Sequence, residues 1–180
     1  MKTWPTAAAT AAALLLFTLA AHAAPTTYAI DPTHTFPSFE ADHMGISVWR
    51  GKLNKSSGKV LFDKAAGTGS VEVVTELSSI DFGLDALATW ARGKDFFDVK
   101  KFPRAAFKGN LQSPVNGVPT QLVGELTLHG VTRPITTQIT ERDGFYHASV
   151  EVNQVDYRIK PFSAMLGTLT PVAAIDGKEF

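Results

Sequence analysis

Residues 71–77 read Val-Glu-Val-Val-Thr-Glu-Leu, so that acidic side chains recur among apolar ones. The stretch 39–43, Phe-Glu-Ala-Asp-His, alternates in the same way. Successive side chains of a β-strand point to opposite faces, so both stretches predict half-buried strands. Glu40, Asp42 and Glu72 would then face water, while the apolar side chains face a core. This pattern predicts an all-β fold.

Similar runs follow along the chain and are separated by turn clusters. The runs are 105–111, 122–129, 135–140 and 145–152, and the turns are Val115-Asn116-Gly117 and Arg142-Asp143-Gly144. Short strands joined by hairpin turns predict an antiparallel up-and-down β-barrel of about eight strands. One segment, 85–98, differs, because Leu84, Leu87, Trp90 and Ala91 recur at helical spacing before Gly93. It predicts a short helix near residues 85–93 that covers an end or an edge of the barrel.

The composition excludes several classes of function. The chain has 180 residues, 17 Lys+Arg against 17 Asp+Glu, and no cysteine. Balanced charge argues against a nucleic-acid or membrane-surface binder, since both need excess positive charge. Without cysteine there is no disulfide, no thiolate nucleophile and no Cys-ligated metal.

The N-terminus has the pattern of a secretory signal peptide. Lys2 precedes an apolar stretch at 7–20, and Ala21-His22-Ala23 is a small-x-small cleavage site. A membrane anchor is the alternative, but the apolar stretch is shorter than the ~20 residues of a spanning helix. We therefore predict a signal peptide at 1–23, one barrel domain at 24–180, no stable membrane insertion, and a periplasmic or secreted protein.

Further motifs resemble the YceI family over nearly the whole of residues 24–180. They are Asp31-Pro-Thr-His34-Thr, Asp42-His43-Met44-Gly45-Ile46, Ser79-Ile80-Asp81, Asp95-Phe96-Phe97-Asp98-Val99, Phe102-Pro103 and Leu126-Thr-Leu-His129-Gly-Val-Thr-Arg-Pro134. The resemblance implies a lipocalin-like antiparallel barrel that binds a long apolar chain, of polyisoprenoid or fatty-acyl type. Composition alone leaves open whether such a barrel is filled by its own side chains or holds a ligand. The resemblance favours the ligand.

The chain departs from that family at three places. Ala88 and Trp90 replace a polar pair, and Lys94 replaces a proline. The segment 153–158, Asn-Gln-Val-Asp-Tyr-Arg, keeps Asn153 and Asp156 but has Gln154 and Arg158 in altered surroundings, which affects head-group contacts. The chain also ends at 177–180, about where a closing strand should begin, so this strand is predicted to be absent or truncated.

Period-2 geometry places the pocket lining on the apolar face of each strand, and phenylalanines of other elements add to it. The predicted ligand-binding residues are Phe39, His43, Leu53, Val60, Phe62, Val71, Val73, Trp90, Phe96, Phe97, Phe107, Leu126, Leu128, Val150 and Val152. His43 is either a polar contact near a ligand head or a hydrogen-bonded core histidine. Trp90 either plugs one end of the pocket, with the head group at the other end, or packs the helix onto the outside.

No catalytic or metal site is predicted. The chain has no Gly-x-Ser-x-Gly elbow, and His34, His43 and His129 lack the spacing of metal ligands. Asp95 and Asp98 flank two phenylalanines and are expected to keep one face of that element wet. Five basic residues form a local stretch, interpreted either as a solvated face or as a site for an anionic head group. They are Lys94, Lys100, Lys101, Arg104 and Lys108.

These features predict a carrier or sequestering protein for a long apolar ligand, namely a polyisoprenoid, an isoprenoid quinone or a fatty-acyl chain. The lipid is the partner, and no other cofactor, no nucleic acid and no enzymatic step is expected. A homodimer is compatible with the sequence. The alternative is a stress-related structural or interaction barrel without an obligatory ligand.

Overall fold

The computed structural model describes residues 24–43, 47–160 and 172–178. The predicted signal peptide therefore lies outside the described residues. The strands are β1 (Thr26–Ala29), β2 (Thr35–His43), β3 (Ser47–Leu53), β4 (Ser56–Asp63), β5 (Thr68–Glu76), β6 (Ile80–Asp81), β7 (Arg104–Gln112), β8 (Gln121–Leu128), β9 (Val131–Arg142), β10 (Phe145–Glu151) and β11 (Val172–Lys178). The helices of the described ranges are η1 (Leu77–Ser79), α1 (Asp85–Ala91) and η2 (Gln154–Tyr157). None of these helices has the length and apolar character to cross a membrane.

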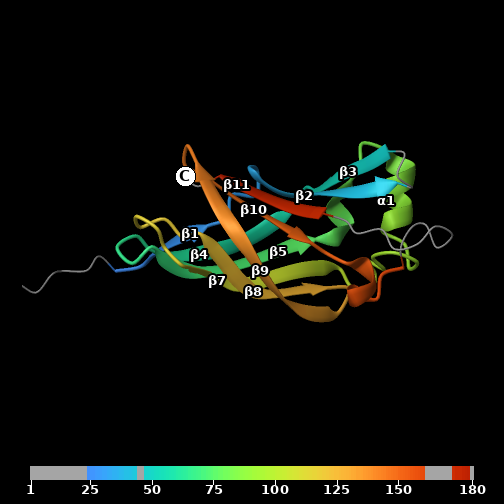
Figure 1. The fold of residues 1–180 in the computed structure, drawn as a ribbon. Coiled ribbons are helices and arrows are strands. Elements are labelled where there is room, and N and C mark those ends of the chain that lie inside the picture. The colour runs from blue at the N-terminus through green and yellow to red at the C-terminus, as the bar shows by residue number, and fades with distance from the viewer. Residues whose placement is uncertain (1–23, 44–46, 161–171, 179–180) are drawn as a thin grey trace, which may run out of the picture.

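The strands form one curled antiparallel sheet (Figure 1). Only Asn54 and Lys55 separate β3 from β4, and the two act as one long strand. β3 pairs with β2 and β6, while β4 pairs with β1 and β5. On one side of this long strand β1 is followed by β2, and on the other side β5 is followed by β6. Each of these pairs therefore counts as one long strand, and the barrel wall has about eight long strands in chain order. The predicted up-and-down barrel is confirmed.

The closing strand is present, so the prediction of an absent or truncated strand is wrong. β11 pairs with β10 on one side and with β2 on the other. Its sequence, Val-Ala-Ala-Ile-Asp-Gly-Lys, is a weak strand signal, because alanine has low β-propensity. The strand begins at Val172, before the position expected from the sequence pattern. It is held by pairing with two neighbouring strands, which the alternation of its own residues does not indicate.

Two-residue turns join the last hairpins. Asp143 and Gly144 connect β9 to β10 with φ angles of 55° and 80°, and His129 and Gly130 connect β8 to β9 with φ angles of 50° and 73°. Two successive positive φ angles are typical of the type I′ turn, which matches the twist of a hairpin. At Gly130 a Cβ atom would also lie 2.5 Å from the Phe102 ring, so only glycine fits there.

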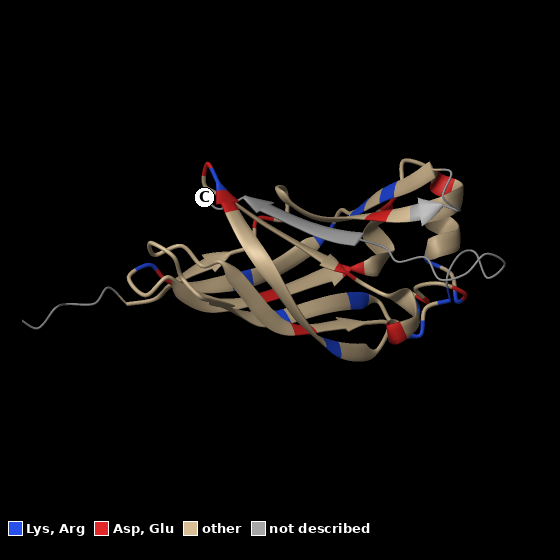
Figure 2. Ribbon diagram, in the orientation of Figure 1, with Lys and Arg blue, Asp and Glu red and all other residues tan. Residues whose placement is uncertain are grey.

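Charged residues are spread along the strands and occur at the turns (Figure 2). Glu40 Oε1 lies 2.6 Å from Arg50 Nε across β2 and β3. Glu72 lies between Lys59 and Lys108, at 3.6 Å and 3.2 Å, and the Lys108 ammonium holds the pKa of Glu72 below its ordinary value. The acidic face predicted for these strands is therefore the outer face, and the apolar positions point inward.

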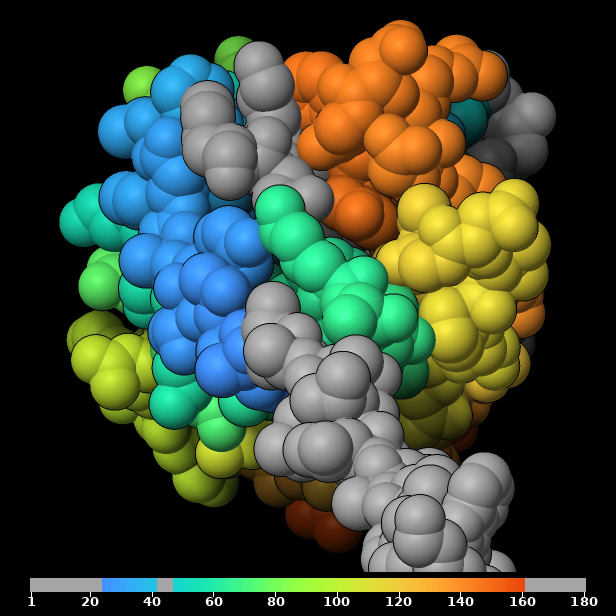
Figure 3. Space-filling view, turned by 90° about the vertical axis from the view of Figure 1, so that its left-hand side faces the viewer, coloured from blue at the N-terminus to red at the C-terminus, as the bar shows by residue number. Residues whose placement is uncertain are grey.

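The two ends of the barrel are covered by different elements. α1 covers one end, and its buried Ala88 and Ala91 pack in a core cluster with Ile80 and Phe96 (Figure 1). The helix is confirmed within the predicted range. Figure 3 shows the opposite end, where β1, the β4–β5 turn, the loop before β8 and the β9–β10 turn meet.

Candidate ligand-binding site

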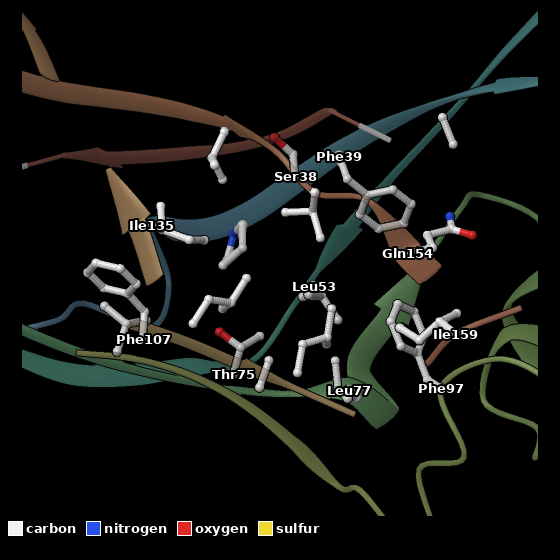
Figure 4. Close-up of a pocket in the computed structure, with 18 of the residues that line it drawn as sticks. Ser38, Phe39, Leu53, Thr75, Leu77, Phe97, Phe107, Ile135, Gln154 and Ile159 are labelled. Carbon is white, nitrogen blue, oxygen red and sulfur yellow. The ribbon is translucent and has the colours of Figure 1, made fainter. Parts of the chain in front are cut away.

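The barrel encloses a cavity of about 210 Å³ between its middle and the end under α1 (Figure 4). This cavity, called cavity 1, receives side chains from the strands, from α1 and from the segments on either side of it. Among its described lining residues none is charged, and nearly all are apolar. Such a cavity excludes ions and favours hydrocarbon.

Cavity 1 brings together most of the predicted binding residues. Those that line it are Phe39, Leu53, Val73, Trp90, Phe96, Phe97, Phe107, Leu126, Leu128, Val150 and Val152. They come from distant parts of the chain, and the aromatic rings contact one another. The ring centroids of Phe96 and Phe97 are 4.6 Å apart, and those of Trp90 and Phe96 are 5.0 Å apart.

A second cavity of about 250 Å³, called cavity 2, lies toward the β1 end. Val60, Phe62 and Val71 of the predicted set line it, and Val73, Leu122 and Ala148 line both cavities. The two cavities are therefore adjacent parts of one interior. Cavity 2 differs in its polar groups, since Tyr28, Asp31, Thr35, Tyr146 and His147 are among its lining residues.

One predicted residue is not placed, and others were missed. The side chain of His43 lies outside the described part of the structure. Leu122 and Ile135 line cavity 1 and were not predicted, although Leu122 shares the period-2 face of Leu126 and Leu128. Gln154 was missed as a lining residue for a different reason, because a polar residue in a short 3₁₀ segment carries no periodicity signal.

In the segment 153–158, which departs from the family pattern, Gln154 lines cavity 1, and so does Ile159 directly after it. Asn153 Oδ1 accepts a hydrogen bond from Val155 N at 3.1 Å and caps η2. The Tyr157 carbonyl lies 3.1 Å from His129 Nδ1, and the Ile159 amide donates to the Gln154 carbonyl. These contacts tie η2 to the β8–β9 turn and fix the backbone that carries Gln154.

Trp90 has both of the features considered for it. Its side chain lines cavity 1 and contacts Phe96, yet the residue is 37% exposed. Ala88, by contrast, is buried on the inner face of α1. The drier, bulkier end expected from the Ala88 and Trp90 departure is thus the end of the interior under α1.

The histidines that the structure describes do not gather into a metal site. His129 bonds a backbone carbonyl, and His34 Nδ1 lies 2.7 Å from Asp31 Oδ2. Asp31 also accepts hydrogen bonds from Thr33, and with His34 these lower the pKa of Asp31 to about 2. Among the described residues no three His, Asp or Glu side chains are arranged to hold a metal ion.

The basic stretch lies outside the two cavities. Lys108 pairs with Glu72, and Lys101 Nζ lies 5.1 Å from the centroid of the Phe102 ring. Lys94, Lys100 and Arg104 are exposed. None of the five basic residues is among the lining residues described for either cavity.

Comparisons with known proteins agree with this architecture. The model of the YceI-like domain family matches residues 28–175. A UPF0312 protein of Yersinia pestis is 34% identical over 158 residues, which cover 83% of this chain and 81% of that protein. A UPF0312 protein of Vibrio parahaemolyticus is 34% identical over 114 residues, 62% of this chain and 60% of that protein.

Solved structures of low identity share the fold. The BcnA structure of Burkholderia cenocepacia superposes with a TM-score of 0.67 at 18% identity and covers 83% of this chain and 99% of BcnA. A polyisoprenoid binding domain from Saccharophagus degradans gives a TM-score of 0.59 at 17% identity, over 84% of this chain and 98% of that domain. The YCEI protein of Campylobacter jejuni gives a TM-score of 0.59 at 16% identity, over 77% and 90%.

Proposed function

Because the chain belongs to the YceI-like domain family, we propose that its barrel binds one long apolar chain and carries or sequesters it away from water. The ligand class is a polyisoprenoid, an isoprenoid quinone or a fatty-acyl lipid. The name of the Saccharophagus degradans domain, which describes polyisoprenoid binding, supports this class. The function is binding, and no chemical step is proposed.

The observation that carries the proposal is the pair of adjacent apolar cavities. Cavity 1 and cavity 2 share Val73, Leu122 and Ala148, so a flexible chain that enters one can continue into the other. An apolar cavity of ~150 Å³ in another protein stays free of water and takes up benzene. Each of the two cavities here is larger than that, and their lining offers a chain little besides hydrocarbon contact.

The energetics favour a long ligand over a short one. Each buried methylene group contributes about 0.8 kcal/mol, so ten of them contribute about 8 kcal/mol before the costs of association. The loss of translational and rotational freedom costs about 4–15 kcal/mol and depends little on the length of the chain. A ligand must therefore bury many carbons to bind, as a polyprenyl or acyl chain does.

We also propose that binding takes place after export. The pattern of residues 1–23 supports removal of a signal peptide and a periplasmic or secreted location. Cell fractionation followed by N-terminal sequencing tests this. We expect a mature chain that starts at Ala24, and an uncleaved chain in the cytoplasm would contradict the proposal.

Native mass spectrometry of protein purified from cells that express the full chain tests the binding function. We expect a stoichiometric adduct that organic extraction removes, and uptake of the neutral dye Nile red by the extracted protein. The exterior variant Glu72→Gln is the control and should keep both. An interior that neither retains a lipid nor takes up the dye would instead support the structural or interaction barrel.

A further inference from the structure

The amide oxygen of Gln154, on the wall of cavity 1, has no hydrogen-bond partner among the described residues. Gln154 is 9% exposed, and its Oε1 atom is buried. Buried carbonyl oxygens are normally paired, because an unpaired one loses its water without compensation. Figure 4 shows Gln154 at one end of the group of lining residues, on the side of Phe39 and Ile159.

Two other polar side chains of this wall are bonded within the protein. Thr75 Oγ1 lies 3.1 Å from Ser56 Oγ, and Thr137 Oγ1 donates to the Ser149 carbonyl. Gln154 differs because its backbone is held by η2 and by the hydrogen bond from the Ile159 amide, while its Oε1 atom has no partner among the described residues. A fixed backbone and an unpaired acceptor together form a site that is prepared for a donor.

The charge of the cavity restricts the donor further. No charged residue is found among the described lining of cavity 1. A carboxylate or phosphate head would lose its water there without gaining a cation. The head group that fits is therefore uncharged, and one that carries a hydrogen to donate would pair with Gln154 Oε1.

From these observations we propose that Gln154 Oε1 accepts a hydrogen bond from an uncharged hydroxyl at the head of the bound chain. The ligand class is thus a long-chain alcohol, such as a prenol or a fatty alcohol. This inference rests on the proposed function and narrows its ligand class. It places the head at the α1 end, with the tail extending past Phe107 and Leu122 toward cavity 2. This is the opposite of the orientation expected from a Trp90 plug against the tail.

A competition assay tests the hydroxyl. Protein from cells that express the full chain is freed of lipid and loaded with Nile red, which is then displaced by ligands of one chain length: hexadecanol, its methyl ether, hexadecanal and ionised palmitate. We expect hexadecanol to bind about tenfold more tightly than the ether or the aldehyde, and palmitate to bind more weakly than hexadecanol. The comparison needs no variant, so it does not depend on the folding of a mutant.

Substitution of the acceptor assigns the preference to Gln154. In Gln154→Met the amide is replaced by an apolar chain of similar length, and hexadecanol should lose about tenfold in affinity while the ether keeps its own. Val155→Ala is the matched control, since Val155 lies next to Gln154 on η2 but is 52% exposed, and it should leave the preference unchanged.

The failures of the two proposals are distinguishable. If none of the four ligands displaces the dye, both the proposed function and the hydroxyl inference are overturned. If all four bind equally, or if Gln154→Met keeps the preference for the alcohol, the lipid-binding function stands and the assignment of the head group to Gln154 is overturned.

Discussion

The two ends of the barrel interior differ in their polar groups. Under α1, cavity 1 has aromatic rings and the Gln154 amide, with no charge among its described lining residues. At the β1 end, the lining of cavity 2 includes two tyrosines, His147 and Asp31. No lysine or arginine is among the lining residues described for either cavity. An anionic head group would therefore lack a permanently charged cation to pair with at either end.

The largest expected effect comes from a charge placed where the two hydrophobic core clusters of the interior meet. Leu126 packs against both core clusters, so in Leu126→Asp an unpaired carboxylate would lie in the apolar interior. We expect a loss of unfolding free energy of more than about 3 kcal/mol and no retained lipid. Denaturant titration and lipid extraction measure these. The neighbouring exposed position supplies the control, Glu125→Ala, which should change neither.

A smaller effect is expected from a substitution that separates the two cavities but keeps the barrel folded. Ala148 lines both, and Ala148→Phe should fill the passage between them at a stability cost of about 1–3 kcal/mol. We expect long alcohols to lose about tenfold in affinity, while alcohols short enough for one cavity keep theirs. Dye displacement over a series of chain lengths measures this. A uniform loss at every length would show that ligands do not extend from one cavity into the other.

Trp90 tests how the α1 end is closed. If its ring plugs cavity 1, Trp90→Ala should speed release of a fluorescent fatty alcohol several-fold and leave release unaffected by salt. Stopped-flow dilution below the melting temperature measures the rate. If the ring only packs α1 onto the barrel, the melting temperature falls while the release rate stays the same, and the plug is rejected.

The smallest effect is expected at the opposite end. The pKa of Asp31 is lowered from 3.8 to about 2 by its hydrogen bonds to Thr33 and His34. Because the folded pKa lies below the unfolded one, the stabilisation is present above pH 4 and is lost as the pH falls toward 2. Asp31→Asn should lower the melting temperature slightly at neutral pH and reduce its decline between pH 4 and pH 2. Identical decline in both proteins would contradict a role for Asp31.

Much of the barrel could be predicted from alternation, because an outer face in water and an inner apolar face impose a period of two on each strand. The acidic positions Glu40 and Glu72 fixed the register, and their outward pairs with Arg50 and Lys108 confirm it. β11 was not predicted, because its alanines give a weak strand pattern and one of its pairing partners, β2, lies far away in the chain.

The polar part of the site could not be predicted in the same way. Whether Gln154 faces water or the interior depends on how η2 is held. His129 contacts η2 from a distant part of the chain, and Asn153 caps it locally. Leu122 was within reach of the pattern, whereas the unpaired amide oxygen is a property of the assembled barrel alone.

The pairing of β11 with β2 has a consequence for how a ligand would enter the barrel. It joins Val172 to Glu40, which lie far apart in the chain. The chain between them must lose conformational entropy before this contact can form. Pairings of this kind are slow compared with local hairpins. We therefore expect barrel closure to be a late step in folding, after the β7–β10 hairpins have formed. A lipid present at that stage would be enclosed as the wall closes, which makes folding itself a route of loading.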